Sequence, residues 1–127
     1  MKPEKKRILA VDDQASNTRL VKLYLEQTEN YVVREENNAQ AAMATAKEFQ
    51  PHLILLDVMM PGIDGGELAA SIKASPTLKS VPIVFLTAVI TKEEVEQGHG
   101  RVGGHNFLAK PFVLSEMVTC LESHLGK

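Results

Sequence analysis

Three short runs of almost uninterrupted apolar residues are found along the chain, at residues 7–11, 52–56 and 81–86. Runs of this length and character are typical of strands buried on both faces, as in a parallel sheet. Residues 31–35 are more polar and fit an edge strand, and residues 106–109 are a weaker candidate for the opposite edge. The pattern therefore predicts five strands.

Residues with helical spacing, nearly all of them apolar, lie between the predicted strands and after the last of them. They are Leu20, Leu23, Tyr24 and Gln27; Ala39, Ala42, Met43, Ala46 and Phe49; Leu68, Ala69 and Ile72; and Leu114, Met117, Val118, Leu121 and Leu125. Residues 91–97 are short and polar and indicate a weaker helix. The alternation of strand and helix predicts an α/β fold, a doubly wound parallel sheet with helices on both faces and right-handed crossovers.

Composition narrows the class of protein. A chain of 127 residues with mixed charge fits a single domain over residues 1–127, structured over about 5–125. The formal net charge of −2 gives no general attraction to nucleic acid or to an anionic membrane. No segment is long enough to span a membrane, and Cys120 is the only cysteine. We therefore expect a cytoplasmic protein with no direct nucleic-acid partner and no membrane insertion.

Polar residues end the predicted strands. Asp12 and Asp13 end the first predicted strand in chain order, Asp57 the third, Thr87 the fourth and Lys110 the fifth. Ligands of open α/β sheets bind outside the carboxyl ends of the strands. Three carboxylates meeting there would repel one another, so the pattern calls for a cation. Ligation by oxygen alone favours Mg²⁺, with Mn²⁺ or Ca²⁺ as substitutes, over zinc.

A carboxylate beside a divalent cation, an ammonium and a hydroxyl is suited to accept a phosphoryl group. Asp57 would be the nucleophile, Lys110 would neutralise developing charge, and Thr87 would donate a hydrogen bond to a phosphoryl oxygen. Each residue taken singly has a simpler interpretation. An acidic residue at a strand end is usually a helix cap or a solvated turn, and a lone lysine is usually a surface residue.

The segments that carry these residues resemble the signature segments of response-regulator receiver domains. They are residues 11–13, 55–65, 86–88 and 108–112, in the family's order and at its spacing. In length the chain is similar to the single-domain chemotaxis regulators. The resemblance implies a flavodoxin-like sheet order of 2-1-3-4-5. It also implies that Asp57 is phosphorylated by a sensor histidine kinase or a histidine phosphotransfer protein, and that the output surface then switches.

The resemblance assigns roles to individual residues. It implies that Asp13, Asp57 and the backbone carbonyl of Met59 ligate Mg²⁺, while Asp12 acts mainly through water. Ala88, a small residue beside the site, leaves the phosphoryl group room to enter.

The resemblance also implies a switch. Phe107 holds the position of the switch aromatic residue, whose inward rotation is coupled to movement of Thr87. The bond between Lys110 and Pro111 is similar to the family's cis peptide, which would aim the ammonium into the pocket. A downstream protein target, unknown from the sequence, would bind a face that includes Phe107 and the fourth and fifth helices. We expect a monomer or a weak, phosphorylation-dependent homodimer.

At two positions that flank the phosphoryl group in the family, this chain lacks a polar side chain that could orient an attacking water. Met59 and Val89 flank the phosphoryl group in the family and are apolar in this chain, so slow self-dephosphorylation is expected rather than enzymatic turnover. A dehalogenase-like phosphatase is an alternative, but such enzymes place an acid two residues after the nucleophile, where this chain has Met59. A third interpretation is an interaction module that is never phosphorylated, which the intact set Asp12, Asp13, Asp57, Thr87 and Lys110 disfavours.

Overall fold

The computed structural model describes residues 5–57, 59–60, 63–87, 101–102, 105–109 and 114–125, with side chains for 5–57, 67–86 and 114–125. The strands are β1 (Lys6–Val11), β2 (Tyr31–Glu36), β3 (Leu53–Asp57), β4 (Met59–Met60), β5 (Ile63–Asp64), β6 (Ile83–Thr87), β7 (Arg101–Val102) and β8 (His105–Ala109). The helices are α1 (Ala15–Gln27), the 3-10 helix η1 (Ala39–Ala41), α2 (Ala42–Phe49), α3 (Gly65–Ala74) and α5 (Leu114–Leu125).

The main sheet has the order β2-β1-β3-β6-β8-β7. The pairs β1 with β2, β1 with β3, β3 with β6 and β6 with β8 are parallel. The predicted fold class is therefore confirmed. The predicted count of five strands differs from this sheet, because the two-residue strand β7 adds an antiparallel sixth. A two-residue pairing leaves too short a hydrophobic pattern to be recognised in the sequence.

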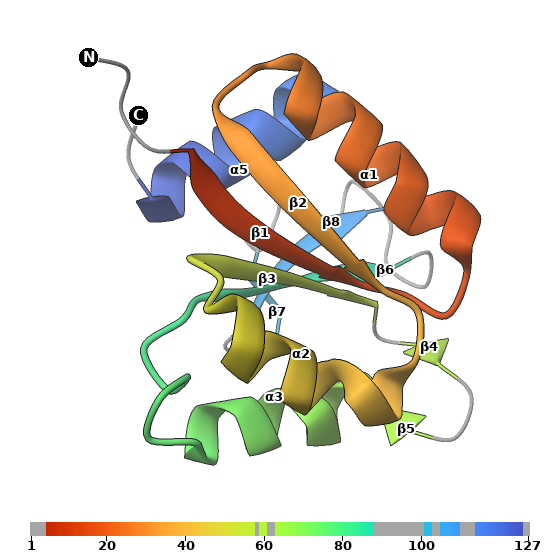
Figure 1. The fold of residues 1–127 in the computed structure, drawn as a ribbon, viewed down its shortest axis with the longest axis vertical. Helices are drawn as coiled ribbons and strands as arrows, with labels where there is room; N and C mark the ends of the chain where they lie inside the picture. Colours follow the sequence, from red (N-terminus) through yellow and green to blue (C-terminus); the bar gives the residue numbers. More distant parts are fainter. Residues whose placement is uncertain are drawn as a thin grey trace.

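Helices cover both faces of the sheet (Figure 1), with α1 and α5 on one face and α2 and α3 on the other. Alternate residues of the central strands supply the two cores, because successive side chains of a strand point to opposite faces. Leu55 packs in the core beneath α1 and α5, whereas its neighbours Ile54 and Leu56 pack in the core beneath α2 and α3. Every residue of β3 is buried.

The edge strand is also confirmed, since Tyr31 and Val33 of β2 are buried while Val32 and Arg34 are exposed. This alternation is typical of a strand with one face against the core. The start of β6 differs by two residues from the predicted run, which began at residue 81. Pro82 has no backbone N–H to donate, and the strand begins after it.

The residues of α1 that face the core are not the residues whose spacing predicted the helix. Leu23 is 53% exposed and Leu20 is 36% exposed, whereas Val21 and Leu25 are buried. Both sets satisfy helical spacing, so periodicity alone could not choose between them. Docking against the sheet decides which set is covered.

Several expectations lie outside the described residues, including the weaker helix at 91–97.

Residues 59–60 and 63–64 form a second, two-stranded antiparallel sheet that follows β3 and leads into α3. This short hairpin comes directly after the strand that ends in Asp57, and it was not predicted as strand.

Candidate functional site

The register of the sheet brings the ends of two distant segments together. Val11 of β1 pairs with Leu56 of β3, so the next residue of each segment, Asp12 and Asp57, emerges at the same carboxyl edge. The backbone N–H of Asp12 donates to the carbonyl oxygen of Glu36 at 3.1 Å, which ties this edge to β2 as well. The predicted convergence of strand ends is thus present.

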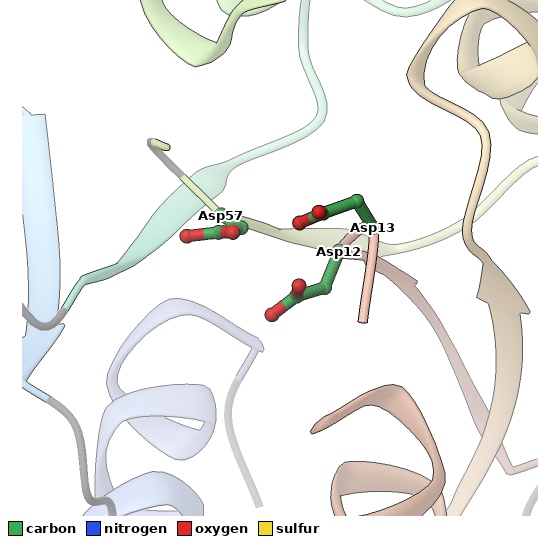
Figure 2. Close-up of side chains that lie close together, drawn as sticks. All are labelled: Asp12, Asp13 and Asp57. Carbon is green, nitrogen blue, oxygen red and sulfur yellow. The ribbon is translucent and has the colours of Figure 1, made fainter. Parts of the chain in front are cut away.

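Three carboxylates share this edge. Figure 2 shows Asp12 and Asp13 at the end of β1 beside Asp57 at the end of β3. One carboxylate oxygen from each lies within 4.8 Å of the other two, a grouping that could hold a metal ion. Asp12 is 2% exposed and Asp57 is 5% exposed, whereas Asp13 is exposed to solvent. Two of the three candidate ligands are therefore withdrawn from bulk water.

Such a grouping has an electrostatic cost. Two unit charges about 5 Å apart repel by about 3 kcal/mol at an effective dielectric constant of about 20. A divalent cation removes this repulsion, and three carboxylates with no sulfur or imidazole among them form a donor set suited to Mg²⁺. The residues present therefore fit a magnesium ion.

Replacing Asp13 by alanine is expected to raise the stability of the metal-free protein, because it removes one charge from the cluster. Asp13 is exposed, so solvent screening limits the gain to about 0.5–1 kcal/mol, or roughly 2–5 °C in Tm. Thermal unfolding in a chelator, followed by circular dichroism, measures the change.

The matched variant Asp13→Asn keeps the shape of the side chain and should give a similar gain. The gain in both variants should shrink as salt is added, because salt screens exposed charges. A lower Tm for Asp13→Ala and Asp13→Asn would mean that the carboxylate makes a stabilising contact that outweighs the repulsion.

Asp12 is held by residues that the sequence did not single out. Its Oδ1 accepts from the backbone N–H of Gln14 at 2.9 Å, and its Oδ2 accepts from Asn17 Nδ2 at 3.0 Å. Its carbonyl oxygen accepts from Asn37 Nδ2 at 2.8 Å. An Asp side chain often accepts from the backbone N–H two residues further on, and this turn signal could have found Gln14. Asn37 lies 25 residues away in sequence and only the fold brings it near.

The structure describes only part of the remaining predicted site residues. The backbone of Thr87 ends β6, Phe107 lies within β8 and Met59 lies within β4, but their side chains are outside the described part. Ala88, Val89, Lys110 and Pro111 lie outside the described residues altogether. Their predicted roles, including the cis peptide, stay predictions.

Cys120 carries no comparable chemistry. Burial raises the pKa of its thiol to about 11, so the reactive thiolate is scarce at neutral pH. It packs against the core beneath α1 and α5, as a small apolar residue would.

None of the described helices combines the length and apolar character needed to span a membrane.

The sequence matches the family model of the response regulator receiver domain over residues 8–122, and the chain belongs to this family. It is 41% identical over 121 residues to the transcriptional regulatory protein ResD of Bacillus subtilis, covering 95% of this chain and 48% of that protein. It is 38% identical over 122 residues to the phosphate regulon transcriptional regulatory protein PhoB of Pseudomonas aeruginosa, covering 96% and 52%. The chain thus spans about half the length of these relatives.

Solved structures agree with this assignment. The chemotaxis protein CheY4 of Vibrio cholerae superimposes with a TM-score of 0.80 at 30% identity, covering 96% of this chain and all of that chain. The receiver domain of the sensor histidine kinase PA1611 from Pseudomonas aeruginosa superimposes with a TM-score of 0.81 at 28% identity, covering 98% of this chain and all of that chain. That structure has a magnesium ion coordinated in its active site cleft.

The fold and the family define the class of protein. The chain is a receiver domain of the two-component signalling type, with a parallel sheet flanked by helices and an acidic cluster at its carboxyl edge. Receiver domains belong to signalling proteins and are generally not turnover enzymes. The predicted family and the predicted general role, that of a receiver domain in two-component signalling, are therefore confirmed.

Proposed function

We propose that Asp57 accepts a phosphoryl group from a histidine kinase or a histidine phosphotransfer protein in a Mg²⁺-dependent reaction. The observation that supports this most strongly is the approach of the Asp12, Asp13 and Asp57 carboxylates to within 4.8 Å, in a chain of the receiver family. Asp57 ends the fully buried central strand β3, so its backbone is held rigidly. A fixed nucleophile needs little reorganisation to reach an in-line geometry.

The proposed transfer forms one bond to phosphorus and breaks another. A carboxylate oxygen of Asp57 attacks phosphorus and forms an aspartyl phosphate, while the bond from phosphorus to the donor nitrogen breaks. The electron pair of that bond leaves with the donor histidine. With acetyl phosphate as donor, the bond to the acetate oxygen breaks instead and acetate leaves. Asp57 itself needs no proton removed, because a carboxylate is already the nucleophilic form.

Other residues of the chain would prepare this step. Asp13, Asp57 and the Met59 carbonyl would hold Mg²⁺, or Mn²⁺ or Ca²⁺ in its place, with Asp12 acting through water. When bound, the cation offsets the charge of the carboxylates and of the phosphoryl oxygens. Lys110 would contribute a further positive charge, and Thr87 would donate a hydrogen bond to the transferred group.

The negative charge of the phosphoryl group on Asp57 would shift a pre-existing equilibrium between two conformations of the output surface. In this proposal Thr87 moves toward the phosphoryl group, Phe107 turns inward, and a downstream protein reads the altered face that includes Phe107 and the predicted fourth and fifth helices. We further propose one receiver domain over residues 1–127, structured over about 5–125, that works in the cytoplasm as a monomer or a weak, phosphorylation-dependent homodimer. Apolar Met59 and Val89 would make self-dephosphorylation slow.

The direct test is incubation with acetyl phosphate and Mg²⁺, followed by intact-mass measurement. Wild-type protein should gain the mass of one phosphoryl group, and Asp57→Ala should gain none, because the nucleophile is absent. A chelator should suppress labelling of the wild type. The same measurement after removal of the donor gives the decay of the labelled species, which we expect to be slow.

Asp57→Asn is the matched control, since it retains the shape of Asp57 without a carboxylate and should also remain unlabelled. Equal labelling of wild type and both variants would place the phosphoryl group elsewhere. No labelling of folded wild-type protein by acetyl phosphate or by phosphoramidate, a nitrogen-linked donor, would contradict the proposed reaction.

A further inference from the structure

Hydrogen bonds hold Asp12 through both its backbone and its carboxylate. Its N–H donates to Glu36, its carbonyl accepts from Asn37, and its carboxylate oxygens accept one each from Gln14 and Asn17. In the part of the chain that the structure describes, Asp13 is exposed and no comparable set of contacts holds it. The carboxylate of Asp12 therefore has a fixed direction before any ligand arrives.

Asn17 lies in the first turn of α1, and it donates to this carboxylate from its side chain, whereas Gln14 donates from its backbone N–H. Its Nδ2 also donates to Gln14 Oε1 at 3.2 Å, so each of its two N–H groups has an acceptor. Both partners are acceptors, which fixes which end of the Asn17 amide faces Asp12. The amide is thus oriented by the same helix end that supplies the Gln14 N–H.

We propose that Asn17 is a positioning residue that holds the Asp12 carboxylate for Mg²⁺, an inference that rests on the proposed function. Gln14 and Asn17 reach different oxygens of the carboxylate, so together they fix its plane as well as its direction. A carboxylate oxygen has two lone pairs, so accepting one of these hydrogen bonds does not by itself keep that oxygen from also facing the cation or a bridging water. Because Asp12 is 2% exposed, bulk water is poorly placed to take over from Asn17.

The role of Asn17 predicts a selective defect. Asn17→Leu keeps the approximate size of the side chain and removes the donor, so the Mg²⁺ concentration for half-maximal labelling should rise roughly tenfold, the scale of losing a hydrogen-bond partner of a metal-site residue. The labelling rate at saturating Mg²⁺ should stay close to that of the wild type, since Asp57 is untouched. Intact-mass time courses with acetyl phosphate across a Mg²⁺ series measure both quantities.

Two comparisons separate positioning from a general structural role. Ser16→Leu places the same side chain on the neighbouring, exposed position of the same helical turn and should leave the Mg²⁺ midpoint unchanged. In an Asp12→Asn background, Asn17→Leu should add little further shift, because the carboxylate that it positions is gone. Asn17→Ala, which also lacks the donor and favours helix, should shift the midpoint in the same direction and serves if Asn17→Leu folds poorly.

An unchanged Mg²⁺ midpoint in both Asn17 variants, with the wild type labelled, would overturn the positioning role and leave the proposed function intact. An equally large shift in the Asp12→Asn background would also overturn it, since the effect would not pass through Asp12. If the wild type is not labelled, the proposed function fails instead. Calorimetric titration of Mg²⁺ into the wild type and the Asn17 variants then still tests Asn17, with weaker binding expected in the variants and equal binding contradicting the role.

Discussion

Replacing Leu25 by alanine is expected to lower the free energy of unfolding by about 2–5 kcal/mol, the range for a leucine removed from a packed core. Leu25 is 0% exposed and belongs to the core between α1, α5 and the sheet. The change removes buried apolar surface and leaves a cavity that the surrounding strands can fill only in part. Denaturant unfolding followed by circular dichroism measures the loss.

Leu23 provides a matched control two residues away on the same helix. It is 53% exposed, so Leu23→Ala should change the free energy of unfolding by no more than about 0.5 kcal/mol. The two variants share the substitution, the helix and the helix propensity of the new residue. Equal losses at the two positions would contradict the burial of Leu25, or would mean that Leu23 is covered in solution.

Addition of Mg²⁺ is expected to produce the second large effect, a rise in the stability of the wild-type protein. A ligand that binds only the folded state at about 100 times its Kd contributes about 2.7 kcal/mol, or roughly 10 °C in Tm for a chain of this size. The physical source is relief of the repulsion among Asp12, Asp13 and Asp57, whose oxygens lie within 4.8 Å of one another. Thermal unfolding across a Mg²⁺ series measures the rise.

Sodium chloride at matched ionic strength separates ion binding from screening, since screening alone needs no specific site. In Asp13→Ala most of the rise with Mg²⁺ should be lost at the same concentrations, because a proposed ligand is missing. A similar rise with sodium chloride, or an undiminished rise in Asp13→Ala, would contradict a specific cation site at this cluster.

The unbroken apolar runs were enough to predict the central strands, because a parallel strand covered on both faces must be apolar at every position. The edge strand β2 was equally readable from its alternation. The faces of α2, α3 and α5 followed from single apolar stripes whose members are buried or packed against the core. Helix α1 was different, because it carries two apolar stripes and the sheet covers only the one with Val21 and Leu25.

The acidic cluster was predictable to the same degree as the strands that carry it. Asp12, Asp13 and Asp57 end apolar runs, and parallel strands bring such ends to one edge of a sheet. The contacts that hold Asp12 were not predictable in this way. Asn17 depends on how the first turn of α1 starts, and Asn37 depends on how the end of β2 lies against β1.

The sequence by itself determined the class of fold, the edge of the sheet where acidic residues gather and the family of the chain. The first two follow from local patterns of apolar and polar residues, and the family follows from the resemblance of whole segments to the family's signature segments. None of the three needs knowledge of the three-dimensional contacts. Only the tertiary structure decided which face of α1 is buried and which side chains orient Asp12. Those choices depend on how α1 docks on the sheet, on how its first turn sits beside the end of β1 and on how Asn37 at the end of β2 reaches Asp12, and the pattern of apolar and polar residues does not encode them.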